Sequence, residues 1–398
     1  MTSFKTYTCG QKCGRRCQDT ARVPLFLPRK RFNPVVGLLG PRQIGKTTLA
    51  EQAAVLWQGK VHRFDLEDER DLERLSTPMR ALEGLRGLVI LDEIQRRKDL
   101  FPTLRVLSDR KPLPARFLVL GNSSPDLLKQ SSESLAGRIS YYELPGISLS
   151  EVGKKDWKRL WTRGGFPRSF LASNETASLD WRRNLVKTYL DRDLPGLDVR
   201  FPAETMRRFW TMLAHVHGQV WNSSEFARSF GVSDKTVRNY LGVLSDTYMV
   251  RLLQPWHENL GKRQVKSPKV YFRDSGLLHL LSGILDFKQL ENHPRCGASW
   301  EGFALEEVIR LTGAWSENCY FWATHQGAEL DLMIIKGSKR IGFEFKFSPS
   351  PGWSPSMKSA MSDLRLDHLW VVHPGKERYP LGTKTEAIPL SLLPKALG

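Results

Sequence analysis

A glycine-bounded loop with a lysine and two threonines is the part of this sequence whose residue types and spacing could do chemistry most directly. Its residues fit the pattern G-x-x-x-x-G-K-[ST], known as Walker A, followed by one further threonine. They are Gly40, Pro41, Arg42, Gln43, Ile44, Gly45, Lys46, Thr47 and Thr48.

Glycines in such a loop let backbone N–H groups face phosphate oxygens, and a helix after the loop adds the positive end of its dipole. We expect Lys46 to reach the β- and γ-phosphates of ATP and Thr47 to bind Mg²⁺. A chance glycine-rich turn is the alternative. The apolar run at 35–39 and the helix-like run at 48–56 favour phosphate binding, because the motif requires a strand before it and a helix after it.

Two adjacent carboxylates, Asp92 and Glu93, follow a second apolar run at 87–91. This is the Walker B pattern. Asp92 is placed to bind Mg²⁺ through its water shell, and Glu93 to orient and activate the attacking water. A solvated strand end is the alternative for an isolated Asp-Glu pair. Together with the loop upstream, Glu93 predicts hydrolysis rather than nucleotide binding alone.

Two further polar positions are candidates for sensing or completing a nucleotide site. Asn122, with Ser123 beside it, comes directly after a strand-like run at 116–120, where a side chain can touch the γ-phosphate or the attacking water. An ordinary turn is the alternative. Arg138 could supply charge to the γ-phosphate of a neighbouring subunit, or it could be a surface arginine.

The composition favours a polyanionic partner and excludes a membrane span. The net charge is +18 and the pI about 9.8, which favours nucleic acid, so DNA is the expected partner. No apolar run approaches the ~20 residues that span a bilayer, and the N-terminus lacks a secretory signal. We therefore expect a cytoplasmic protein that does not have a membrane as its partner. Cys9, Cys13 and Cys17 lack the second pair of a zinc site, which favours incidental cysteines in a basic leader over a metal site.

A helix–turn–helix is predicted at 222–241, with Gly231 in the turn and Ser223 or Ser224, then Ser233, as helix caps. An apolar strand-like run at 248–253 follows, as in a winged helix. Packing against protein is the alternative use of such a unit. The predicted DNA contacts are Lys235, Thr236, Arg238, Asn239, Lys262 and Arg263.

A second carboxylate constellation lies near the C-terminus. Glu344 and Lys346 alternate on one strand and so share a face, and Asp331 lies on a preceding strand. Asp331 and Glu344 could hold a second Mg²⁺, with Lys346 polarising a water. With a helix glutamate from the run at 300–309, this resembles the PD-(D/E)xK nuclease fold. Cleavage and simple gripping of nucleic acid both stay open.

These features predict an α/β protein. We expect a basic leader at 1–33, a P-loop ATPase domain with a parallel sheet at 34–150 and a helical lid or linker at 151–219. A winged-helix domain at 220–290, a small restriction-endonuclease-like α/β domain at 296–375 and a tail at 376–398 follow.

Several strings together resemble one family, the prokaryotic AAA-like ATPases with a C-terminal domain of unknown function. The strings are the loop at 40–47, Leu-Asp-Glu-Ile-Gln at 91–95, Glu-Ser-Leu-Ala-Gly-Arg at 133–138, Gly-Gly-Phe-Pro at 164–167, Asp-Arg-Asp at 191–193 and 271–277. The resemblance implies an AAA+-related fold, Mg²⁺-dependent ATP hydrolysis and a homo-oligomeric ring, a hexamer being favoured. The expected function is a motor that translocates or remodels DNA. A nucleotide-gated regulator that binds a protein or an operator is the alternative.

Overall fold

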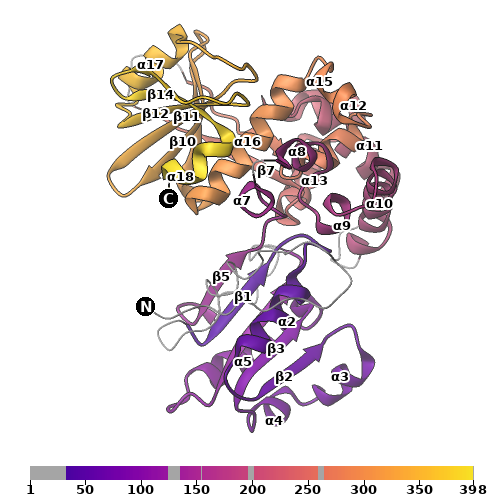
Figure 1. Cartoon of the computed structure of the whole chain (residues 1–398). Coiled ribbons are helices and arrows are strands. Elements are labelled where there is room, and N and C mark those ends of the chain that lie inside the picture. Colours follow the sequence, from indigo (N-terminus) through magenta and orange to yellow (C-terminus); the bar gives the residue numbers. More distant parts are fainter. Residues whose placement is uncertain (1–32, 124–134, 154, 196–200, 259–263, 398) are drawn as a thin grey trace. The chain divides into compact units, whose positions relative to one another are not determined.

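The computed structural model describes residues 33–123, 135–153, 155–195, 201–258 and 264–397 (Figure 1). The leader with Cys9, Cys13 and Cys17 and the predicted DNA contacts Lys262 and Arg263 lie outside these residues. The chain divides into two compact units. The first contains 45–121 with the flanking strands at 35–39 and 139–143, and the second contains 40–44 and the chain from 144 onward.

The first unit is a five-stranded parallel sheet in the order β2-β3-β4-β1-β5. Its strands are β1 (Val35–Leu39), β2 (Val61–Asp65), β3 (Gly87–Asp92), β4 (Ala115–Gly121) and β5 (Ile139–Glu143). The central strands β1, β3 and β4 are buried almost throughout, as their continuous apolar runs predict. The order places β4 between β1 and β3, so the carboxyl ends of these three strands lie at one edge.

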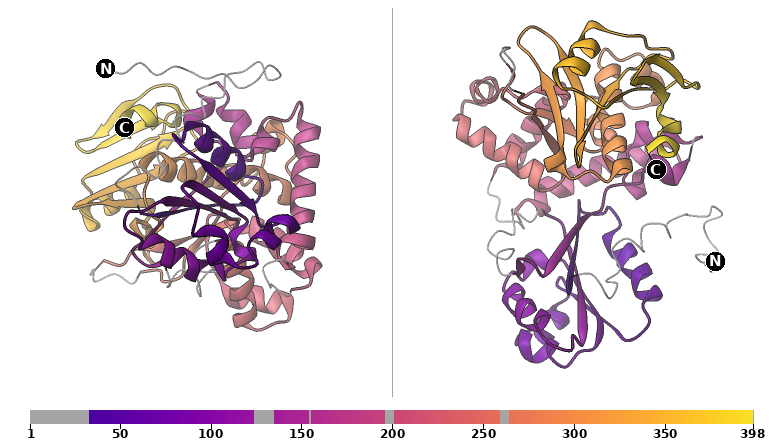
Figure 2. Two further views of the ribbon diagram at one scale, coloured as in Figure 1. Left: turned by 90° about the horizontal axis from the view of Figure 1, so that it is seen from below. Right: turned by 90° about the vertical axis from the view of Figure 1, so that its left-hand side faces the viewer.

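Helices cover both faces of this sheet, as the right-hand view of Figure 2 shows. One face packs on a core that includes Phe101 and Leu104 of α5 (Leu100–Ser108), whereas α2 (Lys46–Leu56) contacts β3 and β4 and contributes nothing to that core. The remaining elements are α3 (Glu69–Arg74), α4 (Pro78–Leu82) and the short η2 (Ile94–Arg96). The predicted parallel-sheet ATPase-like region is confirmed.

Most helices of the second unit lie before residue 313. They are α7 (Leu149–Val152), α8 (Trp157–Arg163), α9 (Pro167–Phe170), α10 (Glu175–Thr188), the π-helical η4 (Tyr189–Asp193), α11 (Ala203–His215), α12 (Ser223–Phe230), α13 (Asp234–Asp246), α14 (Ser275–Leu281), α15 (Phe287–Glu291) and α16 (Cys296–Thr312). The predicted helix–turn–helix is present as α12 and α13, joined through Gly231 in the left-handed conformation.

A nine-stranded sheet runs through the second unit in the order β13-β14-β12-β11-β10-β9-β7-β8-β6. The strands are β6 (Gln219–Val220), β7 (Val250–Pro255), β8 (Lys269–Phe272), β9 (Cys319–Ala323), β10 (Glu329–Lys336), β11 (Lys339–Phe345), β12 (His368–His373), β13 (Tyr379–Gly382) and β14 (Thr385–Pro389). The helices α17 (Pro355–Asp363) and α18 (Leu393–Leu397) follow β11 and β14, and the short η6 (Ser316–Asn318) and η7 (Leu390–Leu392) precede β9 and α18.

Two features of this sheet differ from expectation. β7 pairs in parallel with β9 at Gln254–Tyr320, so one sheet crosses the boundary expected between 290 and 296. The expected tail at 376–398 instead holds two strands and a helix, with Ala387 and Ile388 fully buried. Its prolines are compatible with strands because Pro380 lies on the edge strand β13 and Pro389 at the end of β14.

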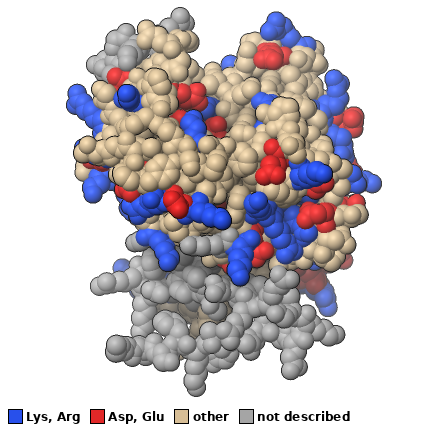
Figure 3. All heavy atoms as spheres, turned by 45° about the horizontal axis from the view of Figure 1, so that its top comes forward, with Lys and Arg blue, Asp and Glu red and all other residues tan. Residues whose placement is uncertain are grey.

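Among the described helices, none is long and apolar enough to cross a membrane. On the face drawn in Figure 3, Lys and Arg side chains are interspersed with Asp and Glu. The net positive charge therefore does not gather into one basic patch on that face.

Candidate nucleotide-binding site

The loop at 40–48 connects β1 directly to α2, as a phosphate-binding loop requires. Gly40 has a φ of 155°, and a Cβ there would lie 2.6 Å from the carbonyl oxygen of Leu144, so glycine is required. Gly45 is the N-cap residue of α2, and no described side chain caps this helix. The helix also has no acidic residue in its first turn, so its N-terminus suits an anion.

Thr47 and Asp92, the two predicted Mg²⁺ ligands, lie in direct contact. The Thr47 hydroxyl donates to Asp92 Oδ2 at 2.8 Å. Neighbouring ligands of an octahedral Mg²⁺ are about 3 Å apart, as bond lengths of about 2.1 Å dictate, so these two oxygens fit the ion. Burial, and then the nearby Glu93, raise the pKa of Asp92, while the Thr47 hydrogen bond opposes them. A bound cation would offset this cost of burying the carboxylate.

Glu93, the predicted general base, has a strained backbone. Its φ of 58° and ψ of 44° place a non-glycine residue in the left-handed region, a conformation that concentrates at functional sites. The Gln95 side-chain amide donates to Glu93 Oε2. Gln95 ends the Leu-Asp-Glu-Ile-Gln string but belongs to neither Walker motif, so its role could not be predicted from the sequence.

The other predicted residues of the ATPase region are placed as follows. Asn122 comes immediately after β4, whose position in the sheet brings its end between the loop after β1 and the carboxylates after β3. The Ser123 hydroxyl is buried without a hydrogen-bond partner among the described residues. Arg138 forms a two-pronged ion pair with Asp109, at 2.6 and 3.0 Å. Within the second unit, Arg42 Nη1 donates to Asp193 Oδ1 at 2.7 Å.

On the helix–turn–helix, Lys235, Arg238 and Asn239 are exposed along α13. Thr236 is half-buried, and its hydroxyl bonds to that of Ser233, which caps α13 as predicted. The cap of α12 differs from the prediction.

Asn222 is the N-cap of α12, in place of the predicted Ser223 or Ser224. The hydroxyls of both serines instead donate to Asp234 Oδ2, at 2.9 and 3.2 Å, which ties the two helices together.

The C-terminal constellation is brought together by β10 and β11. Asp331 Oδ2 accepts from the Phe345 amide at 2.8 Å, and Lys346 Nζ lies 2.8 Å from Glu344 Oε1. Both carboxylates are buried. Across the described ranges, however, no group of three His, Cys, Asp or Glu side chains is placed to hold a metal ion. The predicted second Mg²⁺ site is therefore a pair of carboxylates beside a lysine.

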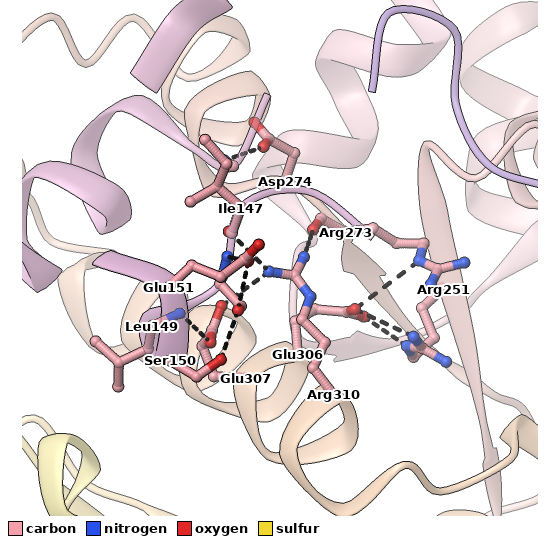
Figure 4. A network of polar contacts seen from close by, with 12 residues as sticks. Ile147, Leu149, Ser150, Glu151, Arg251, Arg273, Asp274, Glu306, Glu307 and Arg310 are labelled. Carbon is pink, nitrogen blue, oxygen red and sulfur yellow. Dashed lines mark hydrogen bonds and ion pairs between the residues drawn. The ribbon is translucent and has the colours of Figure 1, made fainter. Parts of the chain in front are cut away.

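Two glutamates of α16 belong to a separate polar network, drawn in Figure 4. Glu306 accepts from Arg251 at 2.5 and 3.1 Å and lies 3.8 Å from Arg273. Burial alone would raise the pKa of Glu306, but the two arginines outweigh it and lower the pKa to about 2. The neighbouring Glu307 accepts from the Leu149 amide at 2.8 Å. Because both glutamates are paired with groups of the same unit, we interpret this network as one that stabilises the fold.

Three family models match successive parts of the chain. The AAA domain family matches residues 32–153. One domain of unknown function (DUF8612) matches residues 154–288, and another (DUF4143) matches residues 296–393.

Among solved structures, the Walker-type ATPase PABY2304 of Pyrococcus abyssi is 13% identical with a TM-score of 0.40, covering 63% of this chain and 91% of that chain. The RuvB Holliday junction branch migration motor of Thermotoga maritima is 20% identical with a TM-score of 0.26, covering 55% and 81%.

Two curated relatives are much more similar in sequence. They are uncharacterized protein Rv2008c of Mycobacterium tuberculosis and uncharacterized protein Mb2031c of Mycobacterium bovis. Each is 50% identical over 356 residues, which is 89% of this chain and 80% of the relative. The chain therefore belongs to the family of these two mycobacterial proteins, and its N-terminal part is an AAA-type, P-loop ATPase-like domain.

Proposed function

We propose that the chain binds ATP with Mg²⁺ at the loop 40–48 and hydrolyses it. The observation that carries this proposal is the 2.8 Å contact between Thr47 and Asp92, two oxygen ligands from separate elements at an uncapped helix N-terminus. Lys46 would neutralise the β- and γ-phosphates, and Mg²⁺ would balance the charge that develops on the transferred phosphoryl group. Glu93 would take the proton of the attacking water.

The test of this assignment separates binding from turnover. Lys46→Ala should abolish binding of a fluorescent ATP analogue, whereas Lys60→Ala, an exposed lysine of the same unit, should leave it unchanged. Glu93→Gln should bind ATP but hydrolyse it at least ~100-fold more slowly, because proton transfer to a positioned base contributes about that much. Hydrolysis at the wild-type rate by Glu93→Gln would show that Glu93 is not the general base.

We further propose that hydrolysis acts on DNA. The element order α11-β6-α12-α13-β7-β8 supports a winged helix, and α13 offers Lys235, Arg238 and Asn239 to solvent. The net charge of +18 favours a polyanion.

Duplex, single-stranded and branched DNA should each be tested for stimulation of ATP hydrolysis. Lys235→Ala with Arg238→Ala should weaken DNA binding and make it less salt-dependent, since two phosphate contacts are lost. The control is Lys187→Ala, exposed on α10. Nucleotide-dependent binding of a protein, with no effect of DNA on hydrolysis, would favour the regulator.

We also propose that copies of the chain assemble into a ring, a hexamer being favoured, in which Arg138 reaches a neighbour's γ-phosphate. Arg138 is 35% exposed in its pair with Asp109. Because exposed ion pairs contribute little to stability, Arg138 can exchange partners readily. Light scattering of the Glu93→Gln protein with and without ATP tests the assembly, and loss of ATPase activity without loss of assembly in Arg138→Ala tests the role of this arginine.

A further inference from the structure

A buried lysine, which was not among the residues predicted from the sequence, lies within the C-terminal carboxylate cluster. Lys269 of β8 has a side chain only 5% exposed. Its Nζ lies 3.3 Å from Glu301 Oε1 of α16 and forms a second ion pair with Glu329 of β10. The Tyr271 hydroxyl donates to the same Glu301 oxygen at 2.5 Å. The ammonium group is thus held by carboxylates from two other elements, α16 and β10.

The same lysine also acts on Asp331. Asp331 experiences the negative charges of Glu344 and Glu301 and the positive charges of Lys269 and Lys346. Burial first, and then these two glutamates, raise the pKa of Asp331, while the two lysines oppose the rise. Three carboxylates, here called the inner carboxylates (Glu301, Asp331 and Glu344), and the two ammonium groups of Lys269 and Lys346 therefore form one electrostatic cluster.

This donor set does not fit a divalent ion as it stands. Each inner carboxylate already has an oxygen that accepts from a protein group: Glu301 from Lys269 and Tyr271, Asp331 from the Phe345 amide, and Glu344 from Lys346. Mg²⁺ requires oxygen ligands in near-octahedral geometry, and a buried ammonium nearby repels a second cation.

We propose that the Lys269 ammonium takes the place of a divalent cation in this cluster. An internal ion-pair network then holds the C-terminal core together, and the core does not bind the metal ion that metal-dependent cleavage of nucleic acid needs. As placed among the described residues, these carboxylates do not form a metal-binding group. Without the lysine they would be free to close around a cation. Glu344 Oε2 is buried without a hydrogen-bond partner in the described part of the chain, which makes it a ligand for the incoming ion. The inference is independent of the proposed ATP hydrolysis.

The test measures Mn²⁺ uptake by electron paramagnetic resonance on the full-length, nucleotide-free protein. Every sample carries Asp92→Asn to disable the loop site. In the parent protein, which carries only Asp92→Asn, adding Asp331→Asn should not change Mn²⁺ uptake. Adding Lys269→Met should create uptake of about one Mn²⁺ per chain, and adding Asp331→Asn as well should abolish it.

Lys269→Arg is the matched control, because it keeps the charge and should take up no Mn²⁺. Circular dichroism checks that each variant is folded, and Lys269→Gln replaces the methionine variant if that one is not. Mn²⁺ uptake by the parent that Asp331→Asn removes would overturn the proposal. A folded Lys269→Met protein that takes up no Mn²⁺ would overturn it as well.

Discussion

At the scale of single residues, the candidate nucleotide site includes a contact that its motifs do not describe, the hydrogen bond from Gln95 to Glu93. Glu93 is in the left-handed region, so its side chain leaves the backbone in an unusual direction. A base must lie within hydrogen-bond reach of the water that it activates. In the proposed mechanism, Gln95 is therefore a positioning residue for Glu93.

Gln95→Ala should lower kcat for ATP hydrolysis by about tenfold, equivalent to ~1.4 kcal/mol, and leave KM unchanged. The reason is that the Glu93 carboxylate loses its orientation while the phosphate contacts stay intact. Steady-state kinetics at saturating Mg²⁺ measure both constants, with the exposed Gln58→Ala as control. An unchanged kcat would show that Glu93 needs no such support.

At the scale of elements, two strings that are far apart in the sequence meet in the second unit. Asp274 is the N-cap of α14, where Oδ1 accepts from the Leu277 amide at 2.9 Å, and its Oδ2 also accepts from the Gly165 amide at 2.7 Å. A Cβ on Gly164 would lie 2.2 Å from Asp274 Oδ1. The Gly-Gly pair thus permits the close approach between the chain after α8 and the start of α14.

Gly164→Ala should destabilise the protein by about 1–3 kcal/mol more than Gly153→Ala, because only the former overpacks a neighbour. The comparison is matched: Gly153 has a φ of 74° against 78° for Gly164, and nothing lies within 4 Å of a Cβ at Gly153. Backbone strain is therefore common to both variants. Urea unfolding followed by tryptophan fluorescence measures the difference, and equal losses would refute the steric argument.

The same elements show what the sequence could and could not predict. Apolar runs and the glycine-bounded loop were enough to predict the central strands β1, β3 and β4 of the first unit, because these signals are local. The contact between Gly164 and Asp274, the pairing of β7 with β9, and Lys269 in the carboxylate cluster are not encoded in any short window. Each depends on chain segments that only the tertiary fold brings together.

At the scale of the whole molecule, two buried histidines should make stability fall in acid. Burial, as the main cause, lowers the pKa of both His217 and His279 to about 3. His279 bonds the Thr162 carbonyl at 3.0 Å and Ser299 Oγ at 2.7 Å; since a carbonyl only accepts, Nδ1 carries the proton and Nε2 accepts.

Because the folded-state pKa of His279 is depressed, its stabilising contribution is complete above the unfolded pKa of about 6.5 and is lost as pH falls toward 3. Between about pH 7.5 and 5, this histidine should cost about 2 kcal/mol. Buried carboxyls with a raised pKa, such as that of Asp274, act in the opposite direction. The measurement is therefore a difference: acidification should destabilise His279→Gln less than wild type by that amount, and identical pH profiles would contradict the assignment.

The second unit should behave as one folding body despite the match of two separate domain families to it. Its main core joins Leu253, Tyr271 and Leu290 with Trp300 and residues of the C-terminal strands, and β7 pairs with β9 across the boundary. Separating the two parts would expose this apolar surface and leave the β7 edge unpaired.

A protease site inserted between Asn292 and His293, in the exposed turn before α16, tests this continuity. After cleavage, the two fragments should co-elute in size-exclusion chromatography and separate only in denaturant, because the shared core and the strand pairing outlast the broken peptide bond. The uncut insertion variant is the control. Fragments that separate in native buffer would show that the residues before and after the cut fold independently, and that the β7–β9 pairing contributes little to their association.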